Sequence, residues 1–110
     1  MEDLLDLIQL KNLKKVLKMH NFCIEENLHK ILNKLFKKDK KRYEIILKKI
    51  NQIINTIDIE HFKNLRAPLN EFKRVHIDDS FVLTFKYNES EDKIYFYDFD
   101  HHDKIYNKKM

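Results

Sequence analysis

The sequence predicts a single α+β domain, an antiparallel β-meander sheet with a helical hairpin packed against it. Three observations support this class. Apolar residues recur at helical spacing between residues 27 and 57, and residues 73 to 99 are rich in β-branched and aromatic residues. The chain has 110 residues, enough for one modest core. Helices gathered in one part of a chain and strands in another are typical of α+β proteins.

The first 20 residues are expected to form an N-terminal helical extension to a main domain that spans residues 21–110. Residues 2–19 have an approximate amphipathic stripe, which consists of Leu4, Leu5, Ile8, Leu13, Val16 and Leu17. A short strand is expected next, because Phe22 and Ile24 alternate with polar neighbours.

The helical hairpin is the clearest feature of the pattern. Its first helix has the stripe Leu28, Ile31, Leu32, Leu35 and Phe36, and its second has Tyr43, Ile46, Leu47, Ile50, Ile53, Ile54 and Ile57. Asp39 lies between them, where its carboxylate is placed to cap the second helix.

From residue 58 onward the period changes to that of strands. In the segment FKRVHI, Val75 and Ile77 point to one side while Arg74 and His76 point to the other. FVLTFKY (81–87) and IYFYDF (94–99) are predicted to pair through the loop NESED (88–92). The chain contains no glycine, so Asn and Asp must supply its tight turns.

Composition limits the classes of function. Residues 11–49 carry a net charge of +9, although the whole chain carries +4. Such a basic surface attracts polyanions, and the alternative is a set of solvated helix faces. No apolar run approaches a membrane span, the first residues are acidic where a signal peptide is basic, and the single cysteine suits a reducing compartment. We therefore expect a cytoplasmic protein without a membrane partner.

The histidines are the main candidates for chemistry. In a meander, His76 at the start of one strand and the pair His101/His102 after a strand two places later can share one end of the sheet. A metal site at Asp98–Asp103 offers ligand types that suit zinc or iron. However, adjacent residues on an extended chain point to opposite sides, which argues against a single ion here.

Acid–base cleavage of RNA accounts for more of the pattern. It needs a base near the 2′-hydroxyl, an acid for the leaving 5′-oxygen and cations for the phosphoryl oxygens. Histidine serves as acid or base near neutral pH. The cations cluster in sequence around His61 and His76 and are Lys63, Arg66, Lys73 and Arg74. Tyr106, four residues beyond His102, offers a ring for stacking on an unpaired base.

The segment HFKNLRAPLNEFKRVHIDDSFVLTFKYNESEDKIYFYDFDHHDKIY, residues 61–106, resembles the C-terminal half of RelE-superfamily toxins, of the YafQ type in particular. With the helical hairpin, the resemblance covers about residues 21–107. It implies a toxin of a type II toxin–antitoxin module, which cleaves mRNA in the ribosomal A site without metal or other cofactor and leaves a cyclic phosphate. It also implies a cognate antitoxin as partner.

The resemblance assigns roles by position. His102 matches the near-terminal histidine and is the expected general acid, with Tyr106 at the aromatic position that stacks on a codon base. His76 or Asp79 would activate the 2′-hydroxyl, with Asp78 as the fallback carboxylate and His61 assisting. The family's aspartate position after the strand histidine is occupied here by Ser80, which is a departure from the pattern. The basic residues expected to bind RNA phosphate are Lys63, Arg66, Lys73 and Arg74.

Two other functions stay open. The shifted aspartate and the additional N-terminal helix, which most members lack, favour a non-catalytic RelE-fold module that binds RNA or protein. A metal-dependent nuclease centred on Asp98–Asp103 is the third possibility. We also expect the lysine-rich helices to contact ribosomal RNA, and the N-terminal helix to cover the sheet, occlude the site or form a homodimer.

Overall fold

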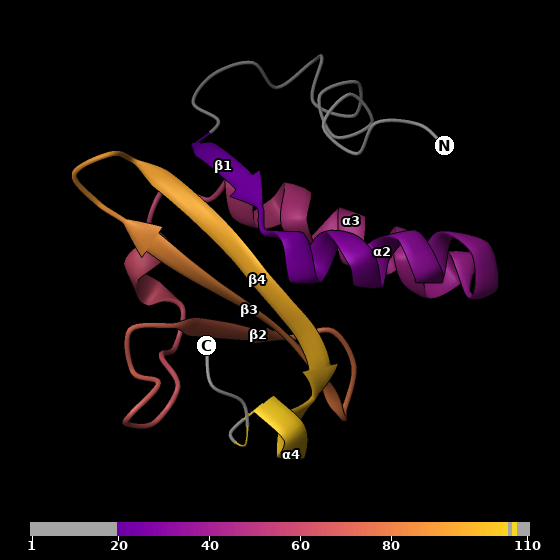
Figure 1. Ribbon diagram of the computed structural model, residues 1–110. Coiled ribbons are helices and arrows are strands. Elements are labelled where there is room, and N and C mark those ends of the chain that lie inside the picture. Colours follow the sequence, from indigo (N-terminus) through magenta and orange to yellow (C-terminus); the bar gives the residue numbers. More distant parts are fainter. Residues whose placement is uncertain (1–19, 106, 108–110) are drawn as a thin grey trace.

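The computed structural model describes residues 20–105 and 107, which form a four-stranded sheet with two helices on one face (Figure 1). The elements are β1 (Asn21–Ile24), α2 (Glu26–Lys38), α3 (Lys40–Ile54), the 3₁₀ turn η1 (Ile59–His61), β2 (Lys73–His76), β3 (Phe81–Asn88), β4 (Lys93–His101) and the one-turn helix α4 (His102–Ile105). The predicted α+β class is confirmed. The predicted N-terminal helix lies outside the described residues, and the division of the chain at residue 20 stays a prediction.

The sheet is mixed, with the strand order β1-β4-β3-β2. The pairs β2–β3 and β3–β4 are antiparallel. β1 instead pairs parallel with β4, where Asn21 lies opposite Lys93 and Ile24 opposite Phe96. The prediction of a wholly antiparallel sheet is therefore wrong at this edge. The two strands can run parallel because α2, α3, β2 and β3 all lie between them in the chain, long enough for a crossover.

The two long helices pack their apolar stripes against the sheet, as the spacing predicted, with one exception. Ile57 was predicted in the second stripe but lies beyond the end of α3 and is 87% exposed. The Asp39 carboxylate accepts a hydrogen bond from the backbone N–H of Arg42 at 3.2 Å, which confirms the predicted cap of α3. The core on this face combines both helices with strand residues. Its buried helical members are Leu28, Leu32, Tyr43, Ile46, Leu47, Ile50, Ile53 and Ile54.

A second, smaller core occupies the opposite face of the sheet. Successive residues of a strand point to opposite faces, so Leu83 enters the larger core and Val82 the smaller one. The loop from residue 62 to 72 and the helix α4 cover this face. Its buried members are Leu65, Leu69, Phe72, Val82 and Ile105. This second face carries the candidate site.

Asp residues make tight turns, as expected for a chain without glycine. Asp92 ends the β3–β4 hairpin loop with a φ of 49°, the left-handed region that Asp tolerates. Asp78 forms the turn between β2 and β3 by accepting hydrogen bonds from two backbone N–H groups. Among the described residues, no helix has the length and apolar character needed to cross a bilayer.

Candidate active site

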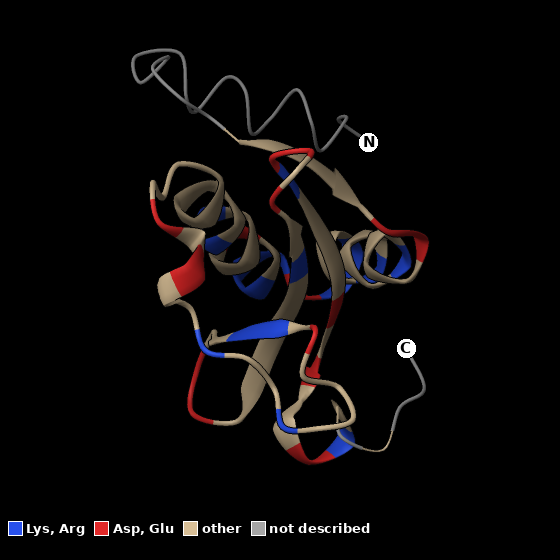
Figure 2. Cartoon of the chain, turned by 90° about the vertical axis from the view of Figure 1, so that its left-hand side faces the viewer, with Lys and Arg blue, Asp and Glu red and all other residues tan. Residues whose placement is uncertain are grey.

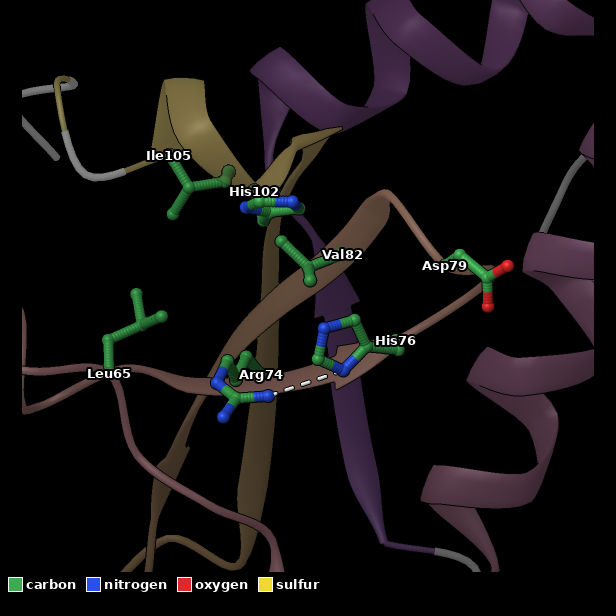
Figure 3. Close-up of a pocket in the computed structure, with 7 residues that line it drawn as sticks. All are labelled: Leu65, Arg74, His76, Asp79, Val82, His102 and Ile105. Carbon is green, nitrogen blue, oxygen red and sulfur yellow. Dashed lines mark hydrogen bonds between the residues drawn. The ribbon is translucent and has the colours of Figure 1, made fainter.

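Seven residues line a hollow of about 240 Å³ on the face with the smaller core (Figure 3). Three of them, Leu65, Val82 and Ile105, are buried members of that core. The other four are residues that the sequence nominated for RNA cleavage: Arg74, His76, Asp79 and His102. Residues far apart in the sequence thus meet in one concave site.

Strand register brings these residues together. His76 lies opposite Val82, and Val82 lies opposite Asp100, so the end of β2, the start of β3 and the end of β4 are adjacent. The backbone N–H of His102 then donates to the carbonyl of Ser80 at 2.9 Å. This bond ties the start of α4 to the turn that follows β2.

Arg74 and His76 form a pair at one wall of the hollow. They alternate along β2 with Val75, which packs against the larger core, so both face the opposite side as predicted. A guanidinium N–H of Arg74 donates to Nδ1 of His76 at 3.3 Å (Figure 3). Arginine has no acceptor, so this bond requires a lone pair on Nδ1 of His76. In the neutral ring the proton is then on Nε2.

His102 stands on the other wall and has a carboxylate partner. Its Nδ1 lies 2.9 Å from an oxygen of Asp103. When the ring is protonated this contact is an ion pair, and Nε2 offers a second position for proton exchange. The ring of His101 stacks on that of His102 with the centroids 4.5 Å apart.

The segment from Asp98 to Asp103, which the argument against a single ion assumed to be extended, is not extended throughout. β4 ends at His101 and α4 begins at His102, so the chain turns between them. One possible ligand atom from each of His101, His102 and Asp103 lies within 4.8 Å of the others. Asp98 does not belong to this group, because it is buried and accepts a hydrogen bond from Asn27.

The two carboxylates after β2 differ in their surroundings. Asp79 is exposed at the rim of the hollow, and in Figure 3 its carboxylate points away from His76 and His102. The carboxylate of Asp78 accepts the backbone N–H groups of Ser80 and Phe81, which hold its pKa below the ordinary 3.8. Asp78 therefore builds the turn, and of the two only Asp79 borders the hollow.

Two predicted site residues lie away from the hollow. Lys73 is only 6% exposed, and its ammonium group donates to the Asn64 side chain at 2.9 Å and to the Phe62 carbonyl at 3.3 Å. It stabilises the loop rather than facing RNA. His61 is exposed on η1, and its ring contacts the carbonyl of Asp58.

Basic residues extend the site along the loop that leads to β2. Lys63 and Arg66 are exposed there on either side of Leu65, which lines the hollow. Figure 2 shows positive charge on this loop and β2, and again along α2 and α3. Tyr106 lies outside the described residues.

Three lining residues were missed by sequence reasoning, namely Leu65, Val82 and Ile105. Their apolar character marked them for a core, and they are buried. The signal for their second role is positional. Val82 faces the same side of the sheet as its partner His76, and Ile105 follows His102 by three residues, about one helical turn.

Comparison with known proteins adds relatives and a shared fold. No family model matches the chain. The sequence is 55% identical over 91 residues to a Methanocaldococcus jannaschii protein named "Putative toxin RelE4", a match that covers 83% of this chain and 95% of the relative. The structure of a YoeB/ParE toxin from Agrobacterium tumefaciens matches with a TM-score of 0.64 at 11% identity, over 74% of this chain and 98% of that one. The structure of YafQ from Escherichia coli matches with a TM-score of 0.57 at 13% identity, over 79% of this chain and 98% of that one. At these identities the two structures show a common fold.

Proposed function

Because this chain belongs to the RelE family of toxins, we propose that it is a ribosome-dependent, metal-independent mRNA endonuclease of a type II toxin–antitoxin module. The observation that carries this proposal is the single hollow shared by Arg74, His76 and His102. It supplies two imidazoles and a guanidinium group, which suffice for an acid, a base and a phosphate ligand.

The proposed reaction is attack by the 2′-hydroxyl of the nucleotide on its own 3′-phosphate. A base takes the 2′-hydroxyl proton, the 2′-oxygen bonds to phosphorus and the bond from phosphorus to the 5′-oxygen breaks. His102 in its imidazolium form gives its Nε2 proton to that leaving oxygen. The products are a 2′,3′-cyclic phosphate and a 5′-hydroxyl end.

His76 is the better placed base. Its Nδ1 lone pair is engaged by Arg74 at 3.3 Å, and a scissile phosphate would compete for the same guanidinium. A hydrogen bond from the guanidinium to phosphate, in which both groups are charged, is stronger than one to a neutral imidazole. Substrate binding would therefore release Nδ1 of His76 to accept the 2′-hydroxyl proton, while Arg74 stabilises the phosphoryl oxygens. Asp79 is the alternative base and would first have to turn its side chain.

The surrounding residues suit a polyanionic substrate. Lys63 and Arg66 on the adjacent loop would hold the RNA backbone on either side of the scissile bond. Tyr106 would stack on a codon base, and the basic residues of α2 and α3 would contact ribosomal RNA without reading its sequence. A cognate antitoxin would neutralise the toxin.

A second candidate is a non-catalytic RelE-fold module that binds RNA or protein. The orientation of Asp79 favours it, because the carboxylate points away from the two histidines (Figure 3). Ser80, which occupies the family's aspartate position, also favours this second candidate.

Mapping of cleavage ends on one mRNA, with and without translating ribosomes, tests the proposal. We expect new 5′-hydroxyl ends within the reading frame that appear only with ribosomes and persist in EDTA levels that leave the ribosomes intact. A catalytically silent protein that still binds ribosomes would favour the second candidate. Cleavage of free RNA that EDTA abolishes would contradict the proposed mechanism.

A further inference from the structure

The side chains of His101, His102 and Asp103 gather at the junction of β4 and α4, beside the hollow. One nitrogen or oxygen from each lies within 4.8 Å of the other two. We propose that these three residues form a binding site for a zinc-type divalent cation, and that the bound ion inhibits RNA cleavage. The inhibitory part rests on the proposed function, whereas the binding part does not.

The spacing of the ligand atoms suits zinc. Two ligands at about 2.0–2.1 Å from a tetrahedral ion lie roughly 3.3 Å apart. Nδ1 of His102 lies 2.9 Å from one oxygen of Asp103, and Nδ1 of His101 lies 3.6 Å from the other. The two imidazoles stack with an interplanar angle of 28°, so one ion on all three residues also requires a ring rotation that turns both Nδ1 atoms toward it. The exposed side chain of His102 leaves room for such a rotation.

The chemistry and exposure of the donors also fit. Two imidazoles and a carboxylate are ligands that zinc accepts readily, whereas calcium and magnesium prefer oxygen alone. The side chains of His101, His102 and Asp103 are 35%, 47% and 75% exposed, so an ion enters without opening the fold. Water would complete the coordination.

The local hydrogen bonds show what the ion would replace. Nδ1 of His102 faces a carboxylate oxygen of Asp103 at 2.9 Å, and zinc bound to Nδ1 would exclude a proton from that nitrogen. At His101 the ion would displace the backbone N–H of Asp103, which donates to Nδ1 at 3.2 Å.

Inhibition follows from the state of His102. The proposed general acid must pass through its imidazolium form, with protons on both nitrogens. A metal ion on Nδ1 excludes that form and also fixes the ring against Asp103. His76 is not among the three grouped ligands, and its Nδ1 is engaged by Arg74.

Calorimetric titration of the metal-stripped full chain with zinc chloride tests binding directly. We expect one ion per chain for the wild type and at least about tenfold weaker binding for His101→Gln, since even outer-shell partners of a metal matter by about that factor. His29→Gln on α2 is the matched control, because His29 is exposed and distant in sequence from residues 101–103. We expect this variant to bind zinc with wild-type affinity.

The same proteins then enter the ribosome-dependent cleavage assay with zinc or with a chelator. We expect zinc to suppress cleavage by the wild type and His29→Gln but not by His101→Gln, with each protein compared with its own rate in chelator. Wild-type zinc affinity in His101→Gln would overturn the site, and zinc that binds there but stimulates cleavage would overturn the inhibition. If no protein cleaves RNA in any condition, the proposed function fails, and the inhibitory role fails with it. The calorimetric titration then still tests whether zinc binds at this site.

Discussion

Lys63 and Lys73 show that residue type alone does not predict a residue's role. Both lie in one basic stretch around β2, and the sequence offers no reason to separate them. In the folded chain Lys63 is exposed, whereas the ammonium of Lys73 is buried against Asn64, Phe62 and Glu60. The difference arises from the isolated bridge between Asn64 and Lys73, a tertiary contact that no periodicity encodes.

This difference gives a paired prediction. Lys73→Ala leaves the Asn64 side-chain oxygen and the Phe62 carbonyl without their buried donor, and we expect it to lower the free energy of unfolding by about 1–3 kcal/mol. Lys63→Ala should change stability by less than about 0.5 kcal/mol and instead weaken RNA cleavage. Urea unfolding followed by circular dichroism measures the first effect. Equal stability of the two variants would show that the burial of Lys73 contributes nothing.

Asp92 predicts a pH dependence of stability. Hydrogen bonds from His20 and then from Tyr87 hold the pKa of its carboxyl below the ordinary 3.8. Because the folded-state pKa is depressed, this stabilisation is present above about pH 3.8 and is lost as pH falls through the folded value.

Tyr87→Phe removes one of the two donors to Asp92. We expect the wild type to exceed this variant in unfolding free energy at neutral pH, and the difference to narrow in acid as the pH falls through the lowered pKa of Asp92. Urea titrations at neutral pH and in acid measure the difference. An equal difference in unfolding free energy at both pH values would mean that Tyr87 stabilises the fold independently of the Asp92 charge.

At the scale of elements, the two long helices and their connection were predictable. Their stripes have a strict helical period, and Asp39 is the right residue type at the right place for a cap. The pairing of β1 with β4 was not predictable, because a four-residue strand carries no signal for its partner or direction. The turn between His101 and His102 was missed for a similar reason, since α4 has only four residues.

The Asp39 cap can be tested by itself. Asp39→Ala leaves the first-turn N–H of Arg42 without its acceptor, and we expect a loss of about 1 kcal/mol of stability, or several degrees in melting temperature. Asp39→Asn keeps an acceptor oxygen and should retain most of the stability. Thermal unfolding of the three proteins measures this. Equal losses in both variants would indicate that the ion pair of Asp39 with Arg42, rather than the cap, stabilises the junction.

At the scale of the whole molecule, the sheet register creates the site. The sequence nominated His76, Arg74 and His102, and the meeting of β2, β3 and α4 placed them around one hollow. The apolar floor of that hollow and the orientation of Asp79 depend on how the loop 62–72 and α4 pack over the sheet. Those contacts join segments distant in sequence, so only the folded chain reveals them.

The central claim is that His102 protonates the leaving oxygen of an RNA phosphate held in this hollow. Single-turnover cleavage of one ribosome-bound mRNA by wild type, His102→Ala and the surface control His29→Ala tests it most directly. General acid catalysis contributes about 10²–10⁴-fold, so we expect at least a 100-fold lower rate for His102→Ala at unchanged melting temperature, and a wild-type rate for His29→Ala. A folded His102→Ala protein that cleaves as fast as the wild type would contradict the account.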